Sequence, residues 1–91
     1  MCTSIVETVE AVGSGKGSGG WFDLTRAVVS YDHPHHAWFE DAITIDFVNP
    51  SLGPGARVAV EISLASAKEL AGALQRAIVA ADVEENAPNR R

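Results

Sequence analysis

The side chains best suited to chemistry are a single cysteine, three histidines and the carboxylates that lie near them in the sequence. They are Cys2, Asp32, His33, His35, His36, Glu40 and Asp41. A thiolate, imidazoles and carboxylates form the donor set that Zn(II) takes in tetrahedral sites, and Fe(II) and copper accept similar donors. We therefore predict a divalent transition metal, Zn or Fe, bound by Cys2, His33 and His36. Asp41 or Glu40 is expected to be the fourth ligand, or to orient a ligand from outside the first coordination sphere.

Other uses of the same residues compete with this interpretation. In an extended segment neighbouring side chains point in different directions, so His35 and His36 are not expected to bind the same ion. In a metalloenzyme, Asp32 or Glu40 would be the catalytic carboxylate that orients a ligand or moves a proton. Without a metal, Asp32 and a histidine would suit an isomerase or a hydrolase. The simplest alternative is a polar loop with solvent-facing histidines beside a small buried cysteine.

Four strands and one helix must position this cluster. The segments 3–12, 21–32, 42–49 and 56–63 are rich in Val, Ile and Thr and alternate in polarity, which predicts strands. The short connections between them predict antiparallel pairing. From about 65 to 83 the apolar residues recur with a period of 3.6, which predicts a helix. The fold class is therefore α+β, a four-stranded antiparallel sheet with one C-terminal helix packed on one face.

The spacing of the turns predicts which residues meet. A first turn centred near residues 16–17 places Cys2 beside Tyr31. A second connection centred near residues 36–37 returns the chain beside Asp32. All the candidate ligands would then gather at one end of the sheet, where the helix also begins. A helix N-terminus favours anions and a thiolate nearby.

The predicted helix has a well-defined apolar side and two candidate caps. Its apolar stripe consists of Ala67, Leu70, Ala71, Leu74, Ala77, Ile78 and Ala81. Ser66 and Glu69 have the spacing of a capping box, and Ser63 is a rival N-cap. We expect one domain over residues 1–83, followed by a polar tail over residues 84–91 that has no packing stripe.

One helix is too little to cover the apolar residues of the sheet. The first strand is apolar at both parities, with Ile5 and Val9 on one side and Val6 and Val12 on the other. A strand that is apolar on both sides needs cover on both sides, and a small chain obtains it from another copy. We therefore predict a homo-oligomer. The alternative function that follows is a non-catalytic accessory subunit, whose loop 33–40 contacts a larger enzyme.

Composition excludes several other classes of protein. The chain has 91 residues, a net charge of −5 and one cysteine. The negative charge argues against nucleic-acid binding, and a lone cysteine argues against a disulfide-stabilised secreted scaffold. No apolar run approaches the roughly 20 residues that cross a membrane, and no signal peptide is visible. These features predict a cytoplasmic protein that binds neither nucleic acid nor membrane.

The segment 13–20, GSGKGSGG, resembles a phosphate-binding loop only superficially. A P-loop requires Ser or Thr after its lysine and lies between a strand and a helix. Here Gly17 follows Lys16, and the segment joins two predicted strands. We interpret it as a flexible loop.

The runs CTSIVETVE, GWFDLTRA, YDHP and IDFVN resemble a family of small bacterial proteins without an assigned activity. These runs lie within residues 2–49, and the last strand and the helix continue the likeness. The resemblance implies a bacterial, actinobacterial-type cytoplasmic protein. It also implies a histidine near the position of Asp41, where this chain has a carboxylate, which puts the fourth ligand in doubt. No catalytic residue is transferred from the family.

Overall fold

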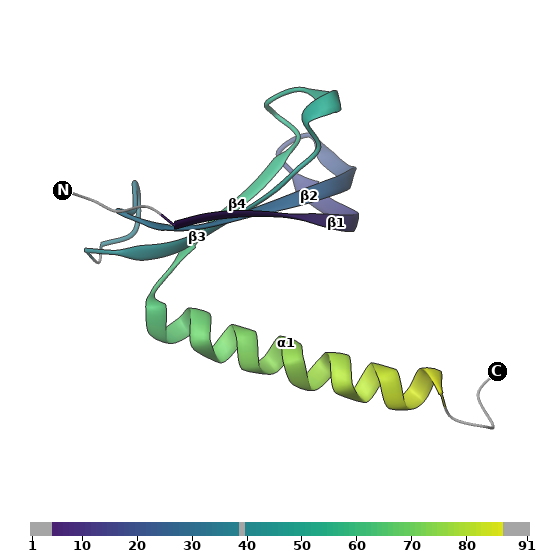
Figure 1. The fold of residues 1–91 in the computed structure, drawn as a ribbon. Coiled ribbons are helices and arrows are strands. Elements are labelled where there is room, and N and C mark those ends of the chain that lie inside the picture. Colours follow the sequence, from purple (N-terminus) through teal and green to yellow (C-terminus); the bar gives the residue numbers. More distant parts are fainter. Residues whose placement is uncertain (1–4, 39, 87–91) are drawn as a thin grey trace.

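The computed structural model describes residues 5–38 and 40–86, and these form one antiparallel sheet followed by one long helix (Figure 1). The strands pair in the order β1-β2-β3-β4. The elements are β1 (Ile5–Gly17), β2 (Gly20–Asp32), β3 (Ala42–Val48), a 3-10 turn η1 (Pro50–Leu52), β4 (Arg57–Ile62) and α1 (Leu64–Glu85). The predicted α+β class and the order β-β-β-β-α are confirmed.

The glycine-rich segment is not the flexible loop that we predicted. β1 continues to Gly17 and β2 begins at Gly20, so the turn has only two residues. Gly20 has a φ of +115°, which favours glycine. A Cβ on Gly15 would lie 3.0 Å from Leu24 Cδ2 and 3.3 Å from Val58 Cγ2. Glycine at position 15 therefore lets this end of β1 come close to side chains of β2 and β4.

The longer hairpin changes the register between the first two strands. Tyr31 pairs with Ile5, so the prediction that Cys2 lies beside Tyr31 is wrong by three residues. The error came from centring the turn within the glycine run, whereas these glycines extend the strands. The pairing also shifts between Glu10 and Gly13, where a bulge adds to the local twist. Cys2 itself lies outside the described residues.

The cross-strand pairs divide the sheet into two faces of opposite character, because paired residues share a face and successive residues alternate. We call the first the apolar face. It carries Ile5, Val9, Ala27, Val29, Tyr31, Ile43, Ile45, Phe47, Val58, Val60 and Ile62, together with Glu7. We call the other the polar face. In its central part lie Ser30, Thr44, Asp46, Arg57 and Glu61.

The helix α1 is capped by Ser63 and not by the Ser66–Glu69 capping box. The Ser63 hydroxyl accepts a hydrogen bond from the Ser66 backbone N–H at 3.1 Å, and the Ser63 carbonyl accepts one from Ala67 at 2.9 Å. This places the start of the helix three residues before the box. At the other end α1 continues to Glu85, so two residues of the expected tail are helical. No helix in the described part of the chain has the length and apolarity to cross a membrane.

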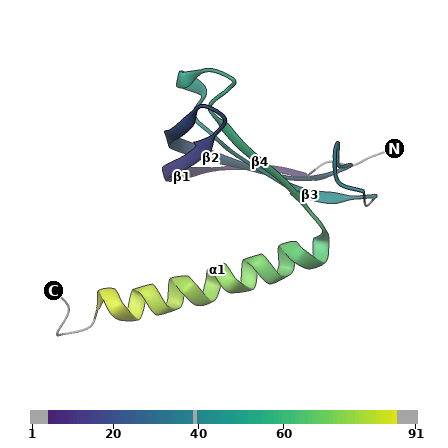
Figure 2. The ribbon, with the colours of Figure 1, turned by 180° about the vertical axis from the view of Figure 1, so that it is seen from behind.

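The helix lies on the side of the apolar face but diverges from it. Figures 1 and 2 show α1 leaving the end of β4 and running away from the sheet toward its C-terminus. Every residue of α1 is at least partly accessible. Among the described residues only Ala27, Ala42 and Asn49 are buried, at 5%, 1% and 6% exposure. The sheet and the helix therefore do not share a closed core within one chain.

Candidate functional site

The bend between β2 and β3 brings together four of the residues that the sequence singled out. The backbone N–H of His33 donates to Asp32 Oδ1 at 2.7 Å. The His33 ring nitrogen Nδ1 lies 3.1 Å from the carbonyl oxygen of Glu40 and 3.3 Å from Asp41 Oδ1. The bend therefore holds the imidazole between a carbonyl and a carboxylate, and the predicted catalytic residues Asp32 and Glu40 flank it.

These neighbours stabilise the protonated imidazole. The pKa of His33 is raised, first by the hydrogen bond to the Glu40 carbonyl and further by the negative charges of Asp41, Asp32 and Glu40, while partial desolvation opposes the rise. Since the folded-state pKa is the higher one, the pair stabilises the fold below the ordinary pKa of 6.5, and this contribution is lost as the pH rises through the folded-state value. The side chains of His33 and Asp41 are 57% and 44% exposed, so the effect on stability is small.

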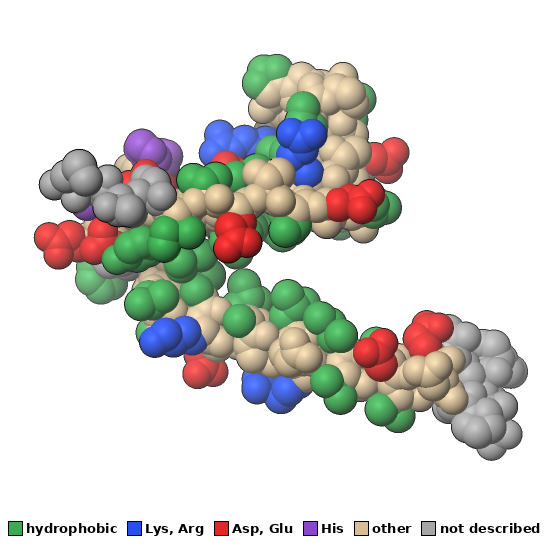
Figure 3. All heavy atoms as spheres, in the orientation of Figure 1, with side chains coloured by type: hydrophobic (Ala, Val, Ile, Leu, Met, Phe, Trp, Pro, Cys, Tyr) green, Lys and Arg blue, Asp and Glu red, His purple; other side chains and the backbone are tan. Residues whose placement is uncertain are grey.

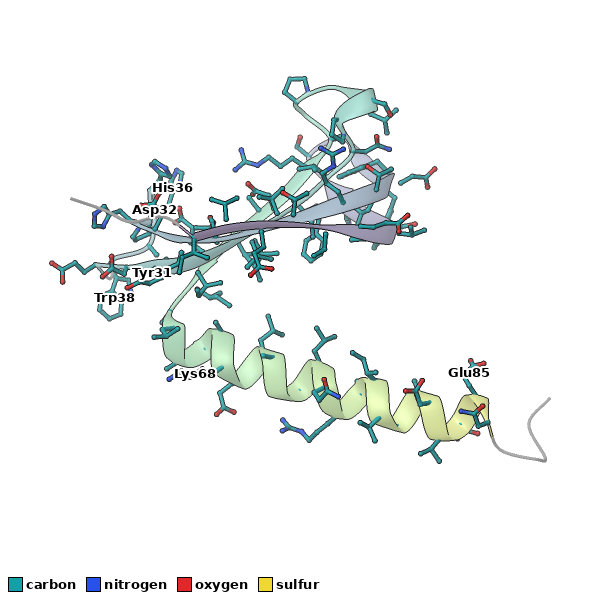
Figure 4. All side chains as sticks on the ribbon, in the orientation of Figure 1. Tyr31, Asp32, His36, Trp38, Lys68 and Glu85 are labelled. Carbon is teal, nitrogen blue, oxygen red and sulfur yellow. The ribbon has the colours of Figure 1, made fainter. Side chains whose placement is uncertain are left out.

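The predicted metal ligands are not assembled within the described residues. His36 lies with Asp32 on the polar side of the sheet, opposite α1, whereas Tyr31 lies on the side of the helix (Figure 4). In residues 5–38 and 40–86 no three His, Cys, Asp or Glu side chains are grouped as a metal site would require. Cys2, the remaining predicted ligand, is outside these ranges.

The residue that organises the bend is Glu61, which the sequence analysis did not single out. Its carboxylate accepts hydrogen bonds from three consecutive backbone N–H groups of the bend between β2 and β3. The distances are 2.7 Å from His35 to Oε2, 2.9 Å from His36 to Oε1 and 2.9 Å from Ala37 to Oε1. The backbone hydrogen bonds, those of His35 and Ala37 foremost, lower the pKa of Glu61 to about 2. An acidic residue near the end of the last strand was the only sequence signal.

Glu61 closes one side of an open hollow of about 1000 Å³ on the polar face. The floor of this hollow holds Asp46 and Arg57, which form a bidentate pair with Nε–Oδ1 at 3.1 Å and Nη2–Oδ2 at 3.2 Å. The hydroxyls of Ser30 and Thr44 are hydrogen-bonded to each other beside it. Two pairs of polar side chains that line the hollow, Asp46 with Arg57 and Ser30 with Thr44, are thus bonded to each other.

A second hollow lies on the opposite, apolar face. This apolar groove has a volume of about 530 Å³, and the first helical residue closes one end of it. It is lined by Ile5, Glu7, Val9, Val29, Ser30, Tyr31, Ile43 and Leu64. Its surface is almost entirely hydrophobic, so it is suited to an apolar side chain or helix and not to a polar metabolite.

The bend should keep its geometry far into the acid range because of Glu61. A group with a lowered folded-state pKa stabilises the fold above its ordinary pKa, here 4.5, and the contribution disappears as the pH falls toward about 2. We expect the amide NMR shifts of His35, His36 and Ala37 to titrate together with a midpoint near 2. A midpoint near 4.5 would contradict the contacts. Glu61→Gln should accelerate hydrogen exchange at these amides, whereas Glu7→Gln on the other face should not.

The comparisons with known proteins place the chain in a family but assign no activity. The Family of unknown function (DUF6295) matches residues 1–87, and the chain belongs to this family. The uncharacterised family expected from the sequence motifs is thereby confirmed. No curated protein matches the chain, and no solved structure matches it.

Proposed function

We propose that this member of the DUF6295 family is a non-catalytic, self-associating protein that acts as a homo-oligomer. The observation that supports the proposal is the position of its hydrophobic side chains. Fourteen large hydrophobic residues of the described chain are exposed, and six of them are on α1. Those on α1 are Leu64, Leu70, Leu74, Ile78, Val79 and Val83. A monomer rarely leaves contiguous apolar surface of this extent in contact with water.

The size of the accessible surface supports the same conclusion. The chain exposes 7042 Å², whereas a compact monomer of 9.6 kDa exposes about 5,100 Å². Its radius of gyration is 15.8 Å, compared with about 12 Å for a compact chain of this length. The surplus, on the order of 2,000 Å² per chain, is the area that a copy contributes to an obligate homodimer interface.

We include in this proposal that the oligomer binds a larger enzyme as an accessory subunit. Trp38, in the bend between β2 and β3, is 94% exposed. Exposed tryptophans at the centre of a contact are common anchors of protein–protein interfaces. Trp38 lies near Tyr31 on the side of the sheet that faces α1 (Figure 4), so a partner that held Trp38 would bind next to the apolar groove. Bacterial origin and a cytoplasmic location belong to the same proposal and rest on the sequence motifs and the lone cysteine.

Light scattering coupled to size exclusion tests the self-association. The expected mass is that of two or more chains of 9.6 kDa each. The melting temperature should rise with protein concentration because folding and assembly are coupled. A folded species with the mass of one chain and a melting temperature independent of concentration would contradict the proposal.

Metal binding is a second candidate, and one observation favours it. His33 Nδ1 faces the Glu40 carbonyl and the Asp41 carboxylate. Histidines that bind a metal through one ring nitrogen usually donate a hydrogen bond from the other nitrogen to such a group. In this arrangement Nε2 of His33 would bind Zn or Fe, and Asp41 would orient the ring. Elemental analysis of protein prepared without a histidine tag, after anaerobic reconstitution with metal, measures the amount of metal bound per chain. Less than a tenth of an equivalent of metal would end this candidate.

A further inference from the structure

We infer that two copies form a two-fold dimer by exchanging helices, so that each α1 packs on the apolar face of the other copy's sheet. This inference rests on the proposed self-association and specifies its geometry. It assigns one occupant, the helix of a second copy, to the space between the sheet and the helix of each chain. Three features of the structure lead to it.

The first feature is the fixed direction of the helix. One residue, Ser63, separates the end of β4 from the start of α1. Its backbone is extended, with φ −67° and ψ 160°, and its carbonyl and hydroxyl oxygens both accept hydrogen bonds from the first turn. Folding α1 back onto its own sheet would require a different backbone conformation at this residue and would break the cap. The cap therefore holds the helix away from its own sheet.

The second feature is that both walls of the resulting wedge are apolar. Figure 3 shows an open gap between the sheet and α1, with hydrophobic side chains gathered on both of its sides. On the sheet the gap begins at the apolar groove, where Val9 is 49% exposed. On the helix the predicted stripe is uncovered, with Leu70, Leu74 and Ile78 between 46% and 60% exposed. The occupant must therefore present a long, continuous apolar surface.

The third feature is that α1 itself satisfies this requirement. Its 22 residues form a rod about 33 Å long and about 10 Å across, with the apolar stripe along one side. In a two-fold pair each copy supplies one wedge and one helix, so both wedges are filled and the assembly is closed. The surplus area per chain is in the range that such an interface buries, on the order of 1,000–2,500 Å².

Cysteine pairs test the exchange directly. In a Cys2→Ser background, Val9→Cys in one chain is mixed and refolded with Leu70→Cys, Leu74→Cys or Ile78→Cys in another. We expect at least one of these mixtures to form a disulfide between the two different chains. Val9→Cys mixed with Val79→Cys, on the other side of the helix, is the matched control and should remain unlinked. The absence of a link at all three stripe positions would overturn the inference.

Two further readouts separate failure of the exchange from failure of the proposed function. When Val9→Cys and a stripe cysteine are placed in the same chain, an intrachain disulfide would show that α1 closes on its own sheet. An oligomeric mass without cross-links between chains would refute the exchange and leave self-association standing, whereas a one-chain mass would refute both. For the unsubstituted protein, isotope-filtered NOEs between labelled and unlabelled chains should connect Leu74 methyls to Val29 methyls. Their absence in an oligomer would also overturn the exchange.

Discussion

Replacing Ile78 by Asp should dissociate the oligomer and leave the chain largely unfolded at micromolar concentrations. Ile78 is 46% exposed in one chain and lies on the helix stripe that we place in the interface. Burying such a side chain contributes about 1.5–3 kcal/mol, and a two-fold interface loses this contribution twice. The dissociation constant should therefore rise by roughly a hundredfold to ten-thousandfold, since each 1.4 kcal/mol corresponds to about a factor of ten. Light scattering and far-UV circular dichroism over a dilution series measure both effects.

Val79→Asp is the matched control for this substitution. Val79 follows Ile78 in the same helix, is 53% exposed and lies about 100° further round, away from the stripe. Aspartate has the same helix propensity at both positions, so the control should assemble like the unsubstituted protein. Equal damage from both substitutions would indicate a general effect on the helix. An unchanged mass for Ile78→Asp would exclude the stripe from the interface.

Replacing Asn49 by Ala should lower the free energy of unfolding by about 2–4 kcal/mol. Asn49 is 6% exposed, and its side chain joins β2 to the segment before β4. Its Nδ2 donates to the carbonyl of Asp23 at 2.9 Å, and its Oδ1 accepts from the Ser51 backbone at 3.2 Å and from the Ser51 hydroxyl at 2.7 Å. Alanine removes all three contacts and the cap of η1, and it leaves part-buried polar groups without these partners.

Two further variants separate the contributions of the Asn49 side chain. Asn49→Asp keeps the acceptor for Ser51 but loses the donor to Asp23, so its loss of stability should still exceed that of Ser51→Ala, which removes a single hydroxyl contact. Urea unfolding at one fixed protein concentration measures all three variants, because assembly contributes to the apparent stability. A loss below about 0.5 kcal/mol for Asn49→Ala would contradict the role of this buried amide.

The local patterns of the sequence were sufficient to predict the strands and the helix of the fold. The alternation in residues 42–49 and 56–63 and the 3.6-residue period after residue 65 correspond to β3, β4 and α1 within two residues at each end. These patterns are reliable because each reports the environment of side chains a few positions apart. The glycine run was misread, since glycine favours a loop by its own propensity but here allows a close approach between strands.

The residues that organise the candidate site could not be found in the same way. Glu61 receives its hydrogen bonds from residues 24 to 26 positions away, and Asn49 donates to Asp23 across 26 positions. Neither residue belongs to a motif, because each partner is a backbone group that any sequence supplies. By contrast, His33 and Asp41 are eight residues apart across one bend, and their proximity was predicted from the turn alone.

The sequence by itself determined the four strands, the helix, the apolar stripe and the excess of hydrophobic residues over what one small chain can cover. These properties depend on residue type and on short-range periodicity, which the chain carries in any conformation. Only the tertiary structure decided that Ser63 directs α1 away from the sheet, that Glu61 holds the histidine bend and that the polar and apolar hollows lie on opposite faces. Those outcomes depend on strand register and on the backbone conformation of a single connecting residue. A slip of one residue in the register would move each side chain to the other face of the sheet, and a different conformation at Ser63 would point the helix in another direction.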